Sequence, residues 1–394
     1  MRLVGTTVRG IRTPIIKEND DLASIVVDSV INASESEGFN FKDKDIIAIT
    51  EAVVGISEGN YATVDNIVSD LNAKFPSKKI GIVYPILSRN RFSMILKAIA
   101  RAMDKVTILL SFPSDEVGNG IMDENLLSAS NFNLGSLISE EDYEKYFGTF
   151  IHPFTGINMV DYYRDLVKSE NCDVEFVFSN NPSDILKYTN NVLTCDIHSR
   201  FKTKKGLSEQ GAFVLSLSDI LNESVGGSGF NPDYGLLGSN KSTDERLKLF
   251  PKDGASLVLK IKDEMFKRTG KNFEVMVYGD GAFKDPVGGI WELADPVVSP
   301  FYTEGLKGTP NEIKLKYVSD NMFADLRGDE LKDAIKEEIK KKDNDLKGQN
   351  VSLGTTPRRI TDLVGSLCDL TSGSGDKGTP VVLVQGYFDN LADE

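Results

Sequence analysis

Residues 274–281 read Glu-Val-Met-Val-Tyr-Gly-Asp-Gly, and this stretch indicates the fold more clearly than any other. The apolar run predicts a buried strand that ends at a carboxylate, Asp280, held between two glycines. Because glycine has no side chain to shield the carboxylate, a metal ion or a phosphate could approach both Asp280 and the backbone beside it. Gly-Asp and Asp-Gly are also ordinary turn pairs, so a simple tight turn is the alternative interpretation.

Length and composition place the chain among soluble globular proteins. Its 394 residues are enough for two or three domains, and 40% of them are apolar and 26% charged. No apolar run approaches the roughly 20 residues that span a bilayer, and no secretory signal pattern follows Met1. The three cysteines are too few and too scattered for a disulfide framework, so we expect reduced thiols and a cytoplasmic location.

The net charge of −14 argues against the classes of protein that need a basic face. A nucleic-acid coat or a protein that binds anionic membranes attracts its partner through clustered lysines and arginines. A nucleotide remains compatible with an acidic protein, because a divalent metal can bridge carboxylates to the phosphates. We therefore expect no nucleic-acid or membrane partner, and we keep nucleotides among the candidate ligands.

The pattern of expected strands and helices divides the chain into three parts. Residues 1–75 form one compact α/β unit, with strands expected at Leu3–Val8 and Asp45–Thr50. Residues 76–205 alternate strands with helices, which predicts parallel βαβ units in an inserted domain. Residues 206–394 return to the first unit and complete it. The expected fold class is therefore α/β, with an inserted doubly wound α/β domain.

Two glycine-rich segments are candidates for anion binding. The first, 225–229, contains Gly226 and Gly227, and glycine lets backbone N–H groups converge on an anion. It matches neither of the two common phosphate-binding fingerprints, and a flexible linker explains it equally well. The second, 373–380, contains Lys377 and reads either as a phosphate or ribose contact or as a helix-to-strand turn. Further polar residues follow the first segment: Ser239, Asn240 and Lys241.

Carboxylates and arginines suggest two further kinds of site. Hard oxygen ligands suit Mg²⁺ or Mn²⁺, and Asp280 has the strongest positional argument because it follows a strand. Arg89 and Arg91 lie where an expected strand passes into a helix, which is where ligands bind in doubly wound domains. The two arginines could hold carboxylates or phosphates, although solvated side chains explain them equally well.

Five segments resemble, in order, the coenzyme F-420-0:L-glutamate ligases. The first is the run Gly10-Ile11-Arg12-Thr13-Pro14-Ile15-Ile16-Lys17-Glu18-Asn19-Asp20-Asp21-Leu22, and the last includes Gly378-Thr379-Pro380 before an apolar strand. Each motif is short, but together they cover about half the chain in the family's order. The segments are 10–22, 45–50 with 57–59, 231–240, 275–280 with 288–289, and 378–386.

The resemblance implies a ligase core with a mixed sheet, and an enzyme that depends on GTP and on Mg²⁺ or Mn²⁺ and acts as a homodimer. In the family's chemistry a carboxylate of a small-molecule acceptor becomes an acyl phosphate, and the amino group of L-glutamate displaces phosphate. Asp280 is then expected as a metal ligand and catalytic residue, with Asp362 as a second catalytic aspartate. The acidic acceptor is expected at Arg89 or Arg91. The nucleotide is expected at Gly226, Gly227, Ser239, Asn240, Lys241 and Lys377.

The chain departs from the family at one expected metal position. The family pattern Gly-x-Asp-x-Ser-Asn corresponds here to residues 235–240, where Leu237 replaces the aspartate. Asp233, four residues upstream, is the expected substitute ligand. The departure keeps two alternatives open: folylglutamate ligation within the same family, and a catalytically inactive protein that binds nucleotide or metal.

Overall fold

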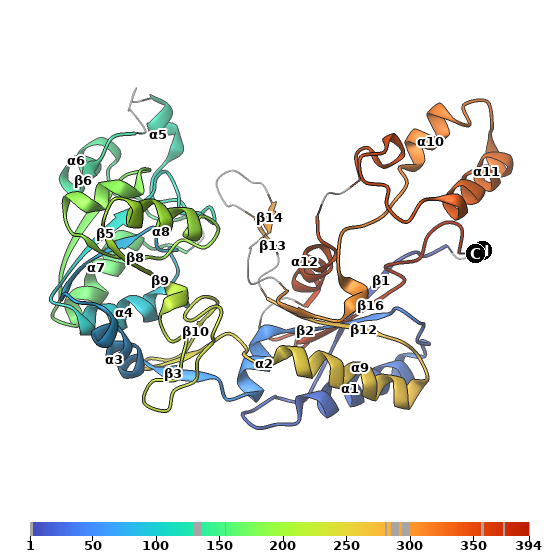
Figure 1. Cartoon of the computed structure of the whole chain (residues 1–394), viewed down its shortest axis with the longest axis horizontal. Coiled ribbons are helices and arrows are strands. Elements are labelled where there is room, and N and C mark those ends of the chain that lie inside the picture. The colour runs from blue at the N-terminus through green and yellow to red at the C-terminus, as the bar shows by residue number, and fades with distance from the viewer. Residues whose placement is uncertain are drawn as a thin grey trace.

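The protein is described by a computed structural model that covers residues 3–129, 135–153, 155–279, 282–284, 291–293, 299–355, 358–372 and 375–393. Large mixed sheets carry helices on their faces, so the predicted α/β class is confirmed. The two largest sheets lie in separate lobes, with the six-stranded sheet at the left of Figure 1 and the five-stranded sheet at the lower right. Asp280, the predicted metal ligand, lies outside the described residues.

The five-stranded sheet has the order β1–β16–β2–β12–β15. Its β2–β12 pair is parallel, and the remaining pairs are antiparallel. The strands β12 and β16 are buried along their whole length, as expected for central strands covered on both faces. The bounds are Thr7–Ile11 for β1, Ile46–Thr50 for β2, Glu274–Tyr278 for β12, Phe301–Tyr302 for β15 and Val381–Gln385 for β16.

Helices cover both faces of this sheet. Helices α1 (Leu22–Glu37) and α9 (Gly254–Thr269) pack on one face, and α12 (Ile360–Ser372) packs on the other. The Asp21 side chain caps α1 by accepting a hydrogen bond from a backbone N–H in its first turn. Helix α9 ends at Gly270, which adopts the left-handed conformation with φ 66°.

The first strand begins later than the sequence predicted. Strand β1 starts at Thr7 rather than at Leu3, and it continues to Ile11. Its limits follow those of its partner, because Thr7 pairs with Gln385 and Ile11 pairs with Val381 at the two ends of β16. Pairing with a distant strand therefore overrides the local apolar pattern.

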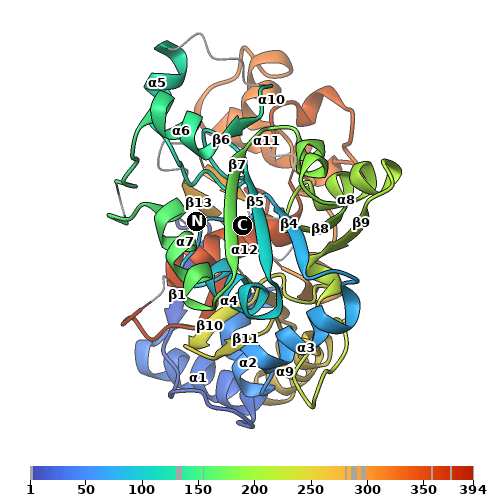
Figure 2. The same ribbon diagram turned by 90° about the vertical axis from the view of Figure 1, so that its left-hand side faces the viewer.

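The six-stranded sheet has the order β6–β7–β5–β4–β8–β9, and Figure 2 shows its central strands side by side. The strands from β7 to β9 run parallel, and the edge strand β6 is antiparallel to β7. Strand β9 belongs to this sheet although it follows residue 205. The bounds are Lys79–Val83 for β4, Lys105–Leu110 for β5, Ile138–Ser139 for β6, Asp173–Phe178 for β7, Asn191–Thr194 for β8 and Phe213–Ser216 for β9.

Helical segments also lie on both faces of the six-stranded sheet. Helices α3 (Val64–Lys74), α4 (Phe92–Ala102) and α7 (Met159–Ser169) share one hydrophobic core with its strands. Helix α8 (Arg200–Glu209) and the 3₁₀ segment η1 (Pro182–Lys187) contribute to a second, smaller core. The first core also contains apolar residues from 217–249, so that part of the chain folds against this lobe.

A small three-stranded sheet leads from one lobe to the other. Its order is β10–β11–β3, with β3 at Tyr61–Thr63, β10 at Asn240–Thr243 and β11 at Arg246–Lys248. Helix α2 (Glu51–Ser57) follows β2 directly and precedes β3. From the end of β2 the chain therefore passes directly into the region where the two lobes meet.

The remaining elements include two helices that lie apart from both large sheets. Helices α10 (Leu315–Asn321) and α11 (Gly328–Lys341) form a separate small cluster, seen at the upper right of Figure 1. Within the described residues, no helix combines the length and the apolar character that crossing a membrane requires. The other elements are α5 (Glu124–Ala129), α6 (Glu140–Phe147), β13 (Ala282–Lys284), β14 (Trp291–Leu293), η2 (Leu217–Asp219), η3 (Glu304–Leu306) and η4 (Asn350–Ser352).

Candidate functional site

A cavity of about 650 Å³ lies where the two lobes meet. Its floor includes Thr50, the last residue of β2, and the segment Gly378–Pro380 that precedes β16. The Thr50 N–H donates a hydrogen bond to the Pro380 carbonyl (2.9 Å), which joins the two parts of the floor. The cavity walls come from the N-terminal segment 13–16, from β10 and β11, and from the loop after β4. We call this cavity the central pocket.

A nearly buried ion pair crosses the central pocket. The Lys248 ammonium lies 2.6 Å from a carboxylate oxygen of Glu51, and the two residues are 6% and 8% exposed. Glu51 is placed by the end of β2, and Lys248 by the three-residue strand β11. Such a pair is held only because each charge compensates the other in a poorly solvated site.

The lobe of the six-stranded sheet contributes an arginine to the same pocket. Arg91 lies in the loop between β4 and α4 and lines the cavity beside Asn90. Burial lowers the pKa of the Arg91 guanidinium, and the nearby carboxylates of Glu51 and Asp369 act in the opposite direction. Asp369 comes from the last turns of α12, so the arginine stands between acidic groups of the other lobe.

The β10–β11 hairpin adds a third cation. Lys241 lines the central pocket next to Asn240, and its ammonium lies 2.6 Å from the exposed Asp244. The Lys241 backbone N–H donates to the Asn90 carbonyl (2.7 Å), so the hairpin is attached to the loop that carries Arg91. The pocket of this acidic protein thus contains three cationic side chains that could bind an anionic ligand: Arg91, Lys241 and Lys248.

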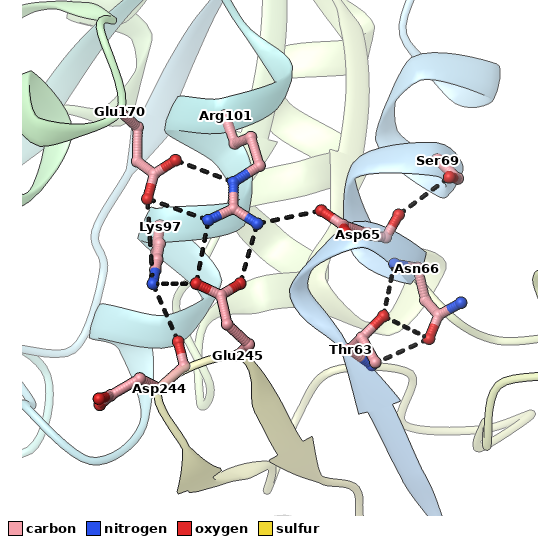
Figure 3. A network of polar contacts seen from close by, with 9 residues as sticks. All are labelled: Thr63, Asp65, Asn66, Ser69, Lys97, Arg101, Glu170, Asp244 and Glu245. Atoms are coloured by element: carbon pink, nitrogen blue, oxygen red, sulfur yellow. Dashed lines mark hydrogen bonds and ion pairs between the residues drawn. The ribbon is translucent and has the colours of Figure 1, made fainter.

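A network of charged side chains, drawn in Figure 3, anchors the tip of that hairpin to α4. Arg101 binds Glu245 (2.9 Å) and Glu170 (2.8 Å), and the Lys97 ammonium lies 2.5 Å from Glu245. Hydrogen bonds from Arg101 and Lys97 lower the pKa of Glu245 to about 2, and the same network raises the pKa of Arg101. The anchor fixes the hairpin against the lobe that supplies Arg91.

The structure brings together some of the predicted site residues. Arg91, Asn240 and Lys241 line the central pocket, and Lys377 lines a second groove described below. Asp362 is at the opposite end of α12 from Asp369, about 10 Å away along the helix axis, and it pairs with Arg359 (3.4 Å).

Several predicted residues lie away from the central pocket. Gly226 and Gly227 form a left-handed turn (φ 60° and 81°), and the Val225 carbonyl in that turn accepts a hydrogen bond from Asn66 at the start of α3. Arg89 and Asp233 are exposed and do not line the cavity. Ser239 is buried and does not line it either.

Leu237, at the position of the family's aspartate, is a core residue. It is 3% exposed and belongs to the hydrophobic core of the six-stranded lobe. A side chain that points into this core cannot ligate a metal in the central pocket. The replacement therefore matches the local packing.

Three charged residues of the pocket were missed by the sequence analysis: Glu51, Lys248 and Asp369. A signal existed for Glu51, because it directly follows a predicted buried strand, where ligand-binding residues gather in α/β folds. Lys248 stands between Leu247 and Leu249, and a lysine within an apolar run is a weaker sign of a buried, paired charge. Nothing local distinguishes Asp369 from other acids on a helix.

The described residues fit a divalent metal in part. Glu51 and Asp369 are two carboxylates that line one pocket, and Mg²⁺ often binds through one or two carboxylates together with substrate phosphates. In the ranges that the structure describes, no three or more His, Cys, Asp or Glu side chains cluster as a metal site. The predicted ligation by Asp280 and Asp233 stays a prediction.

Comparison with known proteins identifies the family. The sequence model of F420-0:gamma-glutamyl ligase matches residues 10–386. No curated protein matches the chain. A crystal structure of eIF2B beta from Chaetomium thermophilum matches 42% of this chain and 43% of its own, with 12% sequence identity and a TM-score of 0.23. This similarity is too low to indicate a shared fold. The match over nearly the whole length is decisive: the chain belongs to the F420-0:gamma-glutamyl ligase family, whose members are ligases that add glutamate.

Proposed function

We propose that the protein uses GTP and a divalent metal, Mg²⁺ or Mn²⁺, to join L-glutamate to a carboxylate of a cofactor-like acceptor. The observation that carries the proposal is the meeting of three cations and two carboxylates in one pocket of a protein with net charge −14. Glutamate ligation already belongs to the family, and the nucleotide, the metal and the intermediate are our additions.

The proposed reaction has two steps whose atoms balance. An oxygen of the acceptor carboxylate attacks the γ-phosphorus of GTP, and GDP leaves with the bridging oxygen, which gives an acyl phosphate. The amino nitrogen of glutamate then attacks the acyl carbon, inorganic phosphate leaves, and an amide bond forms with loss of a proton from nitrogen. A bound divalent cation would neutralise the negative charge on the phosphoryl group while it is transferred.

The residues of the central pocket have separate roles in this proposal. Lys248 and Lys241 bind phosphate oxygens, with Lys248 held in place by Glu51 at 2.6 Å. Arg91 binds the acceptor carboxylate or the phosphoryl group through its planar guanidinium, which suits such oxygens. Asp369 and Glu51 are the described carboxylates that would hold the metal, and Asp280 stays a predicted further ligand.

We interpret the six-stranded lobe as an inserted doubly wound domain that completes the active site. The strand order supports this interpretation, because the chain runs outward through β4, β5 and β7 and then returns to the other side of β4. Ligands bind at such a reversal, beyond the carboxyl ends of the strands. Arg91 follows β4, the strand at which the order reverses.

A turnover assay tests the proposal. The purified protein is incubated with GTP, Mg²⁺ or Mn²⁺, L-glutamate and one acceptor at a time, including a deazaflavin and a folate, and phosphate release is measured. We expect release that requires both glutamate and one acceptor, with the matching amide found by mass spectrometry. GTP binding with metal but without turnover for every acceptor would instead define a nucleotide-binding protein that has lost catalysis.

Two properties implied by the family resemblance complete the proposal. We propose a homodimer located in the cytoplasm. The three cysteines are free and buried, which agrees with a reducing compartment. Light scattering at working concentration tests the oligomeric state, and a monomeric mass would contradict the dimer.

A further inference from the structure

A second groove of about 1030 Å³ lies beside the central pocket. One side is formed by α1, and the other by Thr371 at the end of α12 together with the loop that carries Lys377. Helices α1 and α12 cover opposite faces of the five-stranded sheet, so the groove passes across the free edge of β1. We call it the edge groove.

The edge groove is cationic in a protein that is strongly acidic overall. Arg9, Arg12 and Lys377 line it, against a single acidic side chain, Glu37, in the lining. None of the three cations pairs with a carboxylate among the residues that the structure describes. Arg101, by contrast, is tied to Glu170 and Glu245, so within the described residues the three cations of the groove are not neutralised by ion pairs as Arg101 is.

One of these cations is held ready for a ligand. The Arg9 guanidinium donates to the Gln385 side-chain oxygen (2.6 Å) and stacks over the Phe39 ring at 4.4 Å. The Gln385 amide nitrogen donates in turn to the buried Asp45 carboxylate (2.6 Å), which fixes the amide's orientation. A guanidinium fixed in this way loses little freedom when it binds a carboxylate.

The edge groove is continuous with the central pocket. Pro14 and Thr379 line both cavities. A ligand whose reacting carboxylate lies in the central pocket can therefore extend into the groove without leaving the surface. The segment between them includes Gly378 and Thr379, which belong to the last family motif.

We propose that the edge groove binds an extended chain of carboxylates on the acceptor, such as glutamyl residues already attached to it. The inference rests on the proposed function, because a glutamate ligase makes a product more acidic than its substrate. Charge complementarity selects this occupant over a second copy of the chain. Antiparallel pairing of two β1 strands about their centre would place Arg9 opposite Arg9, and like charges in that position destabilise a sheet.

Binding of tri-γ-L-glutamate, measured by calorimetry without nucleotide, tests the inference. We expect the trimer to bind the wild type and to lose about tenfold in affinity to the double variant Arg12→Gln/Lys377→Gln, since each exposed charge pair contributes about two- to five-fold. Both side chains are exposed, so the variant should fold normally. The matched control is Lys202→Gln/Lys316→Gln, which removes two exposed lysines elsewhere and should bind as the wild type does.

Three results would overturn the inference: equal affinity for the wild type and the groove variant, equal loss in the control variant, or equal binding of a trimer with amidated α-carboxylates. A change in molecular mass of the groove variant alone would show that a second copy covers the edge of β1. Failure of the proposed function is distinguishable. If the trimer binds through the groove but no acceptor is turned over, the ligase proposal fails alone; if turnover occurs and groove variants bind normally, this inference fails alone.

Discussion

The two lobes contribute to the central pocket in different ways. The five-stranded lobe supplies the floor and both described carboxylates, Glu51 and Asp369, from the end of β2 and the end of α12. The six-stranded lobe, although its sheet is larger, supplies one short loop with Asn90 and Arg91. One lobe therefore builds the acidic part of the site, and the other adds a cation to it.

The difference shows that a large domain can be needed to position a single loop at the pocket. Burial of the Arg91 guanidinium is unfavourable, because partial loss of water disfavours its charged form and lowers its pKa. A loop without further support would therefore not keep Arg91 in this half-buried position. The charged network at Glu245 and the backbone contact of Lys241 fix the hairpin against the loop. The six-stranded lobe is thus a rigid mount for the cationic wall of the pocket. The predictions below separate the two contributions.

The largest effect is expected at the Glu51–Lys248 ion pair of the central pocket. Lys248→Met leaves the Glu51 carboxylate nearly buried without its partner, so the free energy of unfolding should fall by about 3–5 kcal/mol. Ligase activity should be lost as well. Urea unfolding gives the first quantity, and amide formation gives the second.

Two further variants make this prediction specific. Glu51→Gln/Lys248→Met should regain much of the lost stability, because no charge remains buried, but it should not regain activity. Lys260→Met breaks the exposed pair with Asp21 (2.9 Å) in the same lobe and should change stability by less than about 1 kcal/mol. An unchanged stability of Lys248→Met would show that the pair is solvated.

The next effect concerns the residue that replaces the family's aspartate. Leu237→Asp places a carboxylate in the apolar core of the six-stranded lobe, and we expect a loss of about 3 kcal/mol of unfolding free energy without a gain in Mn²⁺ affinity. Asp233→Asn, on an exposed side chain close by, should stay within about 0.5 kcal/mol of the wild type. A stable Leu237→Asp variant that binds Mn²⁺ more tightly would refute the packing explanation.

A smaller effect is expected where the hairpin is anchored. Glu245→Gln weakens the contacts with Arg101 and Lys97, so the Lys241 amide should exchange its hydrogen about fivefold faster. The matched control is Glu209→Gln, which affects a looser exposed pair with Lys205 (3.8 Å) on α8. Equal exchange at Lys241 in all three proteins would show that the network does not hold the hairpin.

The same anchor has a pH dependence with a defined sign. The pKa of Glu245 is lowered to about 2 in the folded protein, so its charged form is favoured by folding. Its contribution is complete above the ordinary glutamate pKa of about 4.3 and is lost as the pH falls toward the lowered value. As the pH falls between these values, the protection factor of the Lys241 amide, which removes the intrinsic pH dependence of exchange, should therefore decrease in the wild type and decrease less in Glu245→Gln. A decrease of the same size in both would contradict the assignment.

Most helices and strands could be predicted from local pattern and caps. The strand at β2, the helix that begins after Asp21 and the helix that stops at Gly270 follow directly from apolar runs, capping and glycine. The true start of β1 at Thr7 could not be predicted in this way, because it depends on pairing with β16, far along the chain. Membership of β9 in the six-stranded sheet is likewise a tertiary property.

The site was harder to predict than the fold. Arg91 was selected because it lies at an expected strand-to-helix junction, and Asn240 and Lys241 because they follow the glycine-rich segment 225–229; all three line the central pocket. Lys248 and Asp369 come from separate elements, and no local signal shows that they share a pocket with Arg91. Only the packing of the two lobes brings these charges together.

The central claim is that Arg91, carried by the six-stranded lobe, completes an active site built on the five-stranded lobe. The most direct test is the kcat/KM for glutamate ligation in the wild type, Arg91→Ala and Arg89→Ala, with the acceptor identified by the turnover assay. The account predicts a loss of about 100-fold for Arg91→Ala and less than about twofold for Arg89→Ala, which is exposed and outside the pocket. Equal kcat/KM for the wild type and Arg91→Ala would contradict it.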